Sequence, residues 1–135
     1  MPLRKKSDAD IYVELEPERI RKAREEQFTD VWKWAEQQVN RINRMKGWIN
    51  PGKDRNNGEL IALTHSELSE CLEYMRHGNP KSDHIDMSGA EEELADVLIR
   101  VMDIAYTREF NVAKAFFMKL AYNKTRSYRH GGKKF

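Results

Sequence analysis

The sequence predicts an all-α fold, a bundle of four or five helices within one domain. Three observations support this fold class. Apolar residues recur at helical spacing in four long stretches, residues that cap helices stand before three of these stretches, and no stretch alternates as a strand does. The 135 residues match the usual size of one domain with one core.

The composition limits the function classes. Charged residues make up 34% of the chain against 39% apolar residues, so its helices must be strongly amphipathic to form a core. The net charge of +2 argues against a dedicated nucleic-acid binder, which would carry a large basic excess. Cys71 is the only cysteine, which excludes an intrachain disulfide and disfavours a Cys/His zinc cluster. Its apolar neighbours predict that it is buried.

The expected location is the cytoplasm, without a membrane segment. The basic residues near the N-terminus have no apolar run behind them, so no signal peptide is predicted. No stretch approaches the roughly 18 apolar residues that span a bilayer.

The first helix is expected to follow an irregular lead-in, residues 1–16, and to open the single domain of residues 17–135. Pro17 suits a first helical position, and Gly47 ends the helix. The helix is either continuous to about Met45 or interrupted by a second N-cap at Thr29. Its apolar positions follow helical spacing: Ile20, Ala23, Phe28, Val31, Trp34, Ala35, Val39, Ile42 and Met45.

Three further helices follow a loop of dense turn residues at 47–58, in which Trp48 is unusual because a loop tryptophan generally packs or binds something. Capping residues predict where each helix begins. The expected helices are Gly58–Arg76 after the Asn56/Glu59 pair, Gly89–Arg108 after the Ser88/Glu91 box, and a last helix from Asn111 to about Ser127, before Gly131-Gly132.

Two helices each carry a pair of carboxylates three residues apart, Glu67/Glu70 and Glu93/Asp96. At about 100° per residue, Glu67 lies inside the apolar arc of its helix and Glu70 lies at the edge of that arc. Glu93 borders the apolar face of its own helix, with Asp96 on the same flank. A buried carboxylate is unfavourable unless it is paired or binds a cation.

These acids have two interpretations. They could be caps and surface salt bridges, with Asp96 paired to Arg100 at i,i+4. The inward position of Glu67 and the repeated spacing favour a metal site instead. An all-carboxylate site selects a hard ion, Mg²⁺ or Mn²⁺ as a substitute, and Mg²⁺ keeps positions open for phosphate oxygens. A phosphorylated substrate is therefore expected.

The basic C-terminal part complements this site. Lys119, Asn123 and Arg126 share one helix face, and Lys133 follows in a glycine-containing extension. Cations there are expected to bind phosphate, and Asn123 to contact a sugar or base. The alternative is that they only balance the negative end of a helix dipole.

The order of these residues resembles the MazG-like, all-α nucleoside triphosphate pyrophosphohydrolases. The resemblance rests on Glu67-Leu-Ser-Glu70 followed by Glu92-Glu93-Leu-Ala-Asp96-Val-Leu-Ile, with Lys46-Gly47-Trp48 upstream and Asn123-Lys-Thr-Arg126 and Arg129-His130-Gly131-Gly132-Lys133 downstream. It covers roughly residues 28–135.

The resemblance implies Mg²⁺-dependent cleavage of a nucleoside triphosphate into the monophosphate and pyrophosphate, by a metal-activated water that attacks the α-phosphorus. Glu67, Glu70, Glu93 and Asp96 would bind the metal, and Lys119, Asn123, Arg126 and Lys133 would bind the substrate. Trp48 would stack on the base or only close the end of the bundle. Many members carry two adjacent acids where this chain has Ser66-Glu67. The group that activates the attacking water therefore remains open: it could be Glu67, Glu92 or a hydroxide shared with the metal.

Other functions and the assembly also remain open. The chain could be a non-catalytic helical module that binds a metal or a partner protein, or a related hydrolase of phosphoribosyl-ATP. Four modest helices with acidic stripes bury little core, so a second subunit is expected to complete it, as a homodimer or homotetramer.

Overall fold

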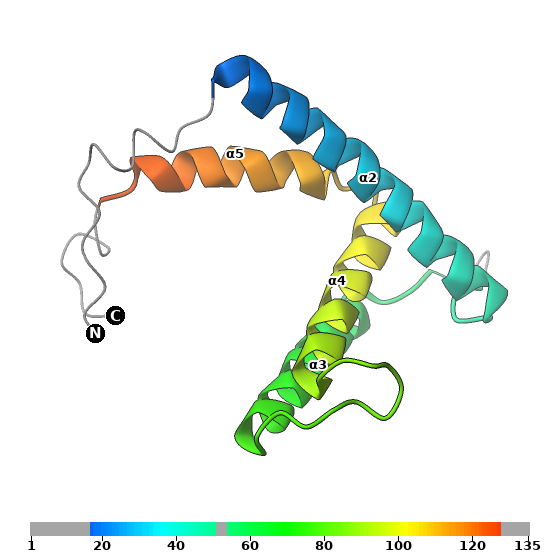
Figure 1. Cartoon of the computed structure of the whole chain (residues 1–135). Coiled ribbons are helices and arrows are strands. Elements are labelled where there is room, and N and C mark those ends of the chain that lie inside the picture. Colours follow the sequence, from blue (N-terminus) through cyan, green and yellow to red (C-terminus); the bar gives the residue numbers. More distant parts are fainter. Residues whose placement is uncertain (1–16, 51–53, 128–135) are drawn as a thin grey trace, which may run out of the picture.

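The computed structural model describes residues 17–50 and 54–127, and every regular element in these ranges is a helix (Figure 1). The helices are α2 (Glu18–Met45), α3 (Asn57–Arg76), α4 (Gly89–Thr107) and α5 (Val112–Thr125). Strand-like pairing in the described ranges is limited to one isolated bridge between Lys81 and Ser88. The predicted all-α class is confirmed, while residues 1–16 and Gly131-Gly132 lie outside the described residues.

The first helix, α2, is continuous, so the alternative of a break at Thr29 is wrong. The Thr29 hydroxyl donates to the Glu25 carbonyl at 2.8 Å, a bond that a threonine makes inside a helix rather than at an N-cap. Pro17 was expected as the first helical residue but is the N-cap residue, so the helix begins one position later, at Glu18. Gly47 follows the C-cap with φ +71°, a left-handed conformation that glycine adopts without strain.

The predicted caps of the other helices are present. The Asn56 side chain accepts from the Glu59 N–H, and the Asn111 side chain accepts from the Lys114 N–H. Ser88 and Glu91 form a complete capping box at the start of α4. The last helix, α5, ends at Thr125, slightly before the predicted end near Ser127.

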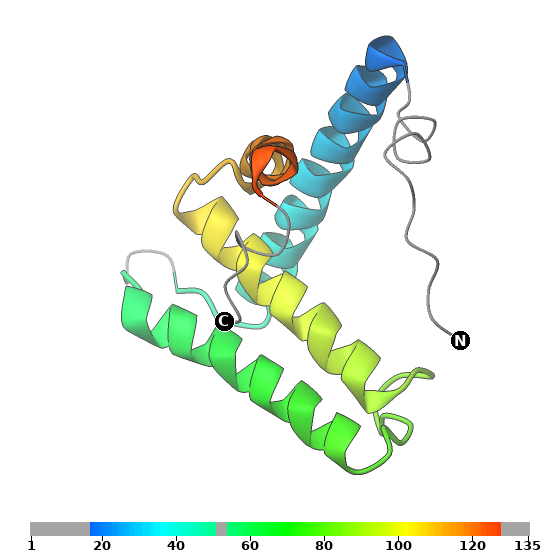
Figure 2. The same ribbon diagram turned by 90° about the vertical axis from the view of Figure 1, so that its left-hand side faces the viewer.

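Helices α3 and α4 pack side by side as an antiparallel hairpin (Figures 1 and 2). The buried apolar residues of their interface are small or medium in size, among them Leu60, Cys71 and Ala90. A Cβ on Gly89 would lie 2.1 Å from the Tyr74 ring, so α4 approaches α3 this closely only because residue 89 is glycine. The predicted burial of Cys71 is confirmed.

Helix α2 contacts α4 with its C-terminal half and α5 with its N-terminal half. Phe28 of α2 stacks on Phe116 and meets Phe117 edge-on, with ring centroids 5.5 and 5.2 Å apart. These rings attach α5 to α2, and Figure 1 shows α5 directed away from the α3/α4 hairpin.

The buried face of α2 is polar. Glu36, Asn40 and Asn43 are its buried residues, whereas Val31 and Trp34 are 62% and 60% exposed. The apolar residues that follow helical spacing in α2 therefore do not form the core of the single chain. None of the described helices combines the length and apolarity that crossing a bilayer requires.

Candidate metal centre and adjoining pocket

The α3/α4 hairpin brings three carboxylates together, which we call the carboxylate triad. Glu67 comes from α3, and Glu93 and Asp96 come from neighbouring turns of α4. One oxygen of each lies within 4.8 Å of the others, a spacing that suits a shared cation. Glu67 and Glu93 are buried and Asp96 is half-buried, so their mutual repulsion is poorly screened by water. A cation or bound protons must therefore offset this charge.

Burial and repulsion raise the pKa values of Glu93 and Asp96, the two carboxyls that α4 contributes to the triad. Desolvation, followed by the charges of Glu70, Asp96 and Glu67, raises the pKa of Glu93 to about 7. Desolvation and the charge of Glu67 likewise raise the pKa of Asp96 above its ordinary value. A divalent cation that displaces these protons would be stabilised by every ionised carboxylate.

Glu70, the fourth predicted ligand, lies at the exposed edge of the triad. Its hydrogen bond with Glu67, together with burial and the charge of Glu67, raises the pKa of Glu70. Glu70 is thus coupled to the triad although it is not one of the three residues whose oxygens lie closest together. The predicted Glu67/Glu70 and Glu93/Asp96 pairs do face each other across the hairpin.

Arg100 neutralises part of this charge. Its Nε donates to Oε1 of Glu67 at 3.0 Å, and its Nη2 forms an ion pair with the same oxygen at 2.9 Å. Arg100 thus pairs across the hairpin with α3, and the alternative of an Asp96–Arg100 pair within α4 is not the arrangement formed. Both of these bonds go to Oε1, so neither uses the Oε2 atom of Glu67.

Glu92, the second predicted catalytic carboxylate, is held by the loop between α3 and α4 instead of by the triad. The Ser82 hydroxyl hydrogen-bonds to Glu92 Oε2, and His84 Nδ1 lies 3.0 Å from Oε1. The bond from Ser82, reinforced by His84, lowers the pKa of Glu92. Glu92 is therefore an ionised carboxylate beside the triad. Its contacts with Ser82 and His84 position the 81–88 loop.

A pocket of about 620 Å³ opens directly beside the triad. Glu67, Asp96 and Arg100 form one side of it, and the exposed Trp48 ring lies at another. Its remaining walls combine apolar, amide and paired charged side chains: Asn43, Arg55, Glu59, Leu60, Leu63, Ile99 and Asp103. The predicted site residues Trp48, Glu67 and Asp96 thus share one cavity, of a size typical for small-molecule ligands.

The ion pair between Arg55 and Asp103 fixes the loop before α3, which forms part of the pocket wall. Arg55 donates to both oxygens of Asp103, at 2.6 and 2.9 Å, and the hydrogen bond with Asp103 raises the pKa of Arg55. Arg108 of α4 reaches the same loop and donates to the Arg55 carbonyl and to Asp54. The segment before α3 is thereby attached to the C-terminal half of α4.

The predicted phosphate-binding residues of α5 are not brought to the triad within one chain. Lys119 lies over the Tyr122 ring, 4.6 Å from its centroid, and Arg126 is the exposed C-cap residue of α5. Asn123 lines a different cavity, and Lys133 lies outside the described residues. Within the described residues, Lys119 and Arg126 thus stand apart from the carboxylates that they are expected to complement.

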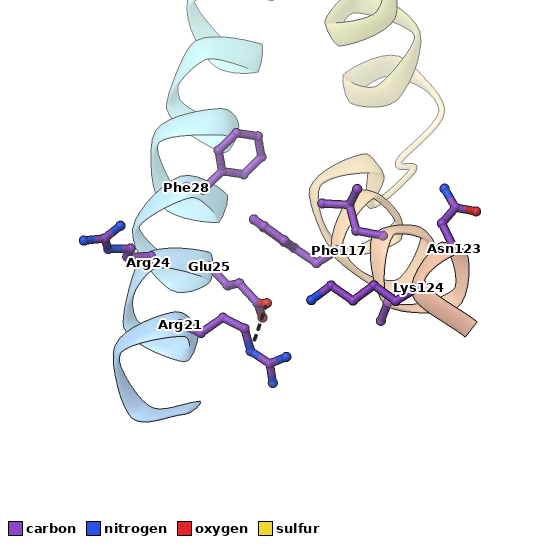
Figure 3. Close-up of a pocket in the computed structure, with 9 residues that line it drawn as sticks. Arg21, Arg24, Glu25, Phe28, Phe117, Asn123 and Lys124 are labelled. Atoms are coloured by element: carbon purple, nitrogen blue, oxygen red, sulfur yellow. Dashed lines mark ion pairs between the residues drawn. The ribbon is translucent and has the colours of Figure 1, made fainter. Parts of the chain in front are cut away.

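That second cavity, of about 640 Å³, lies between the N-terminal half of α2 and the C-terminal half of α5 (Figure 3). Phe28 and Phe117 point into it from the two helices, and Lys124 extends from α5 toward it. Arg21 pairs with Glu25 at 3.8 Å along the α2 wall. The cavity contains none of the triad residues and is separate from the candidate metal centre.

Arg100 and three further residues of the site were not predicted as functional. Asn43 is buried at the pocket wall, and Arg55 and Asp103 form the ion pair beside it. Asp103 continues the α4 flank of Glu93 and Asp96 at helical spacing, which is a sequence signal for it. Arg55 stands in a loop, where no periodicity indicates its partner.

The chain matches no family model, no curated protein and no solved structure.

Proposed function

We propose that this chain is a Mg²⁺-dependent hydrolase that cleaves a nucleoside triphosphate or deoxynucleoside triphosphate into the monophosphate and pyrophosphate. The observation that carries this proposal is the meeting of Glu67, Glu93 and Asp96 within 4.8 Å beside a ligand-sized pocket. The MazG-like order of motifs in the sequence supports the same reaction. No other cluster of this kind is found in the described residues.

The residues fit a hard divalent cation. All three donors are carboxylates, and the raised pKa of Glu93, about 7, reflects a charge that lacks compensation near neutral pH. Glu67, Glu93 and Asp96 would hold Mg²⁺, or Mn²⁺ in its place, with Glu70 at the open edge. When bound, the ion would neutralise phosphate charge and acidify a water molecule.

The chain's own groups would orient the substrate around this centre. The exposed Trp48 ring offers a face on which a base can stack, and the buried Asn43 amide offers a donor and an acceptor in the same pocket. Arg100 pairs with Glu67 of the triad, and it would share its guanidinium between Glu67 and a phosphate. Glu67 and Glu92 remain the two candidates for accepting a proton from water.

Lys119, Asn123 and Arg126 would make their proposed phosphate contacts at the triad of another copy of the chain. Because α5 packs on α2 and is directed away from the hairpin, these residues would reach a triad only from a second copy of the chain. The triad and its pocket, in contrast, are built from one chain.

Incubation of the purified protein with Mg²⁺ and a panel of nucleoside and deoxynucleoside triphosphates, with pyrophosphate as the readout, tests the proposal. We expect release from at least one of them and a fall of about 100-fold or more in Glu67→Gln, since metal-site residues commonly have effects of this order. Glu73→Gln is the matched control, because Glu73 is on the same helix but exposed. Its activity should be unchanged.

The outcome also separates the competing functions. A folded protein that binds Mg²⁺ but releases no pyrophosphate from any triphosphate would contradict the proposal and favour a metal-binding module. Phosphoribosyl-ATP belongs in the panel, because exclusive cleavage of it would identify the related hydrolase instead.

A further inference from the structure

His84, in the loop between α3 and α4, is held in a fixed orientation beside the carboxylate triad. Its Nδ1 lies 3.0 Å from Glu92 Oε1. Because an ionised carboxylate only accepts hydrogen bonds, Nδ1 carries a proton and donates it to this bond. The ring is nevertheless 78% exposed, and its Nε2 makes no hydrogen bond with the residues that the structure describes. The pair with Glu92 thus orients the imidazole and leaves Nε2 available to a ligand.

Ser82 holds both members of this pair in place. Its hydroxyl donates to Glu92 Oε2 and accepts the backbone N–H groups of His84 and Ile85, at 2.9 and 3.3 Å. Its own N–H donates to the Met87 carbonyl at 2.9 Å, which closes the loop. Ser82 is only 5% exposed, and the donor and both lone pairs of its hydroxyl are used. It is therefore placed to position Glu92 and His84, not to act as a nucleophile.

The triad lies between this pair and the ligand-sized pocket. The α4 residues that line the pocket, among them Asp96, Arg100 and Asp103, run from the triad toward the C-terminus of the helix. Glu92 lies on the same helix face one turn before Asp96, about 6 Å away along the axis. The loop that carries His84 joins α4 at this N-terminal end of the hairpin (Figure 2). A ligand that extends along α4 therefore passes from the pocket, across the triad, to His84.

His84 and Arg100 place positive charge on the two sides of Asp96 along α4. Burial and the charge of Glu67 raise the pKa of Asp96, whereas the charges of Arg100 and His84 act in the opposite direction. Both cations therefore lie close enough to Asp96 to interact with it. A polyphosphate bound at the triad would extend its negative charge toward one of them. Between Glu92 and a phosphate, a doubly protonated imidazole donates a hydrogen bond from each of its nitrogens.

We propose that His84 is a substrate-binding residue whose Nε2 donates a hydrogen bond to the terminal phosphates of the triphosphate, and that Ser82 and Glu92 position its ring. The base of the nucleotide then lies in the pocket beside Trp48, and the part released as pyrophosphate lies against the 81–88 loop. The proposal rests on the proposed function for the identity of this substrate. It also implies that a nucleoside monophosphate, held at the metal, does not reach His84.

Binding of inorganic pyrophosphate to the full chain at saturating Mg²⁺, measured by isothermal titration calorimetry, tests this contact without requiring turnover. His84→Ala should raise the dissociation constant about tenfold, the loss expected for one charge-assisted hydrogen bond. His84→Gln should recover part of the affinity, because its amide nitrogen can take the place of Nε2. His84→Asn, whose shorter amide reaches only the place of Nδ1, should not.

His77→Ala is the matched control. His77 is also an exposed histidine whose Nδ1 pairs with a glutamate, but its partner is the exposed Glu73, at 3.2 Å. This variant should bind pyrophosphate as tightly as the unmodified protein does. Circular dichroism of every variant confirms that it is folded.

Ser82→Ala tests the positioning role. It should weaken pyrophosphate binding when His84 is present and have no further effect when it is combined with His84→Ala, because Ser82 acts through the histidine. An equal loss in both backgrounds would mean that Ser82 only maintains the loop, and it would overturn this part of the proposal.

Triphosphate cleavage separates this proposal from the proposed function. For a triphosphate that the unmodified protein cleaves, His84→Ala should lower kcat/KM about tenfold and leave inhibition by the corresponding monophosphate unchanged. If the unmodified protein cleaves no triphosphate, the proposed function fails, and calorimetry alone decides whether His84 binds the pyrophosphate group. The His84 contact is overturned if the unmodified protein does not bind pyrophosphate with Mg²⁺, or if His84→Ala binds it equally well.

Discussion

Glu67 lies between one cation, Arg100, and two other carboxylates. Its Oε1 atom accepts a hydrogen bond from Arg100 Nε and forms an ion pair with Arg100 Nη2, and its carboxylate also belongs to the triad with Glu93 and Asp96. A buried carboxylate next to two others is unfavourable, so Arg100 and bound protons stabilise the hairpin when no metal is present. The same side chains thus control both the stability of the hairpin and its affinity for a cation.

The raised pKa of Glu93 predicts a pH dependence of stability. Its folded value of about 7 exceeds that of an unfolded glutamate, near 4.3, so the folded state holds more protons between these values. The free energy of unfolding in metal-free buffer should therefore fall as the pH rises from about 5 to 8, by on the order of 2 kcal/mol. Urea unfolding at several pH values measures this slope. Glu93→Gln should flatten it, and an equal slope in that variant would contradict the assignment.

Removing Arg100 should make the hairpin depend more strongly on metal. In Arg100→Gln, Glu67 loses its cation, and we expect the free energy of unfolding in chelator to fall by about 1–2 kcal/mol, since the pair is only partly buried. Added Mn²⁺ should then raise the melting temperature more than in the unmodified protein. Thermal unfolding with chelator and with Mn²⁺ measures both effects. An equal metal response in the two proteins would contradict this account.

At the scale of elements, the loop before α3 is held by side chains and not by backbone pairing. Arg55 of the loop pairs with Asp103 of α4, and Arg108 at the end of α4 pairs with Asp54 of the loop. The two aspartates lie in different surroundings. Asp103 is buried at 3% exposed, whereas the side chain of Asp54 is almost fully exposed. Both are arginine–aspartate pairs, but the Arg55–Asp103 pair is buried and bidentate, whereas the Arg108–Asp54 pair is exposed at its aspartate and uses one oxygen.

We expect Asp103→Asn to lower the free energy of unfolding by about 2 kcal/mol, because it leaves Arg55 partly buried without its counter-charge. Asp54→Asn should change it by less than about 0.5 kcal/mol, as is usual for exposed pairs. Urea unfolding of both variants measures the difference. Similar effects in the two variants would show that the buried pair does not fix the loop.

At the scale of the whole molecule, the chain exposes large apolar side chains on every helix, including Trp34, Leu68, Leu98 and Phe116. If folding and association are coupled, as the second subunit expected from the sequence would require, the melting temperature must depend on protein concentration. A hundredfold increase in concentration should raise it by about 5 °C for a domain of this size. Differential scanning calorimetry at two concentrations measures the shift. A constant melting temperature would contradict coupled folding.

The local features of the fold could be predicted from the sequence. Ser88 with Glu91, Asn56 and Asn111 identified where three helices begin, because a cap depends on residues three positions apart. The facing of Glu67 toward Glu93 and Asp96 was also predictable, since two consecutive helices joined by a short loop pack antiparallel. These interactions depend on neighbours along the chain, or on the adjacent helix alone.

The sequence by itself determined an all-α fold of four or five helices, the caps of three of them and the two acidic pairs, whereas the tertiary structure decided which face each described helix presents to the others. Helical spacing shows that α2 is amphipathic, but only packing shows that α4 takes its polar face and leaves Val31 and Trp34 exposed. Packing likewise decided that Arg100 pairs with Glu67 and that α5 lies on α2. The physical reason is that distant segments compete for the same helix faces. Which contacts form depends on the total surface that all the helices, and the expected second subunit, bury together.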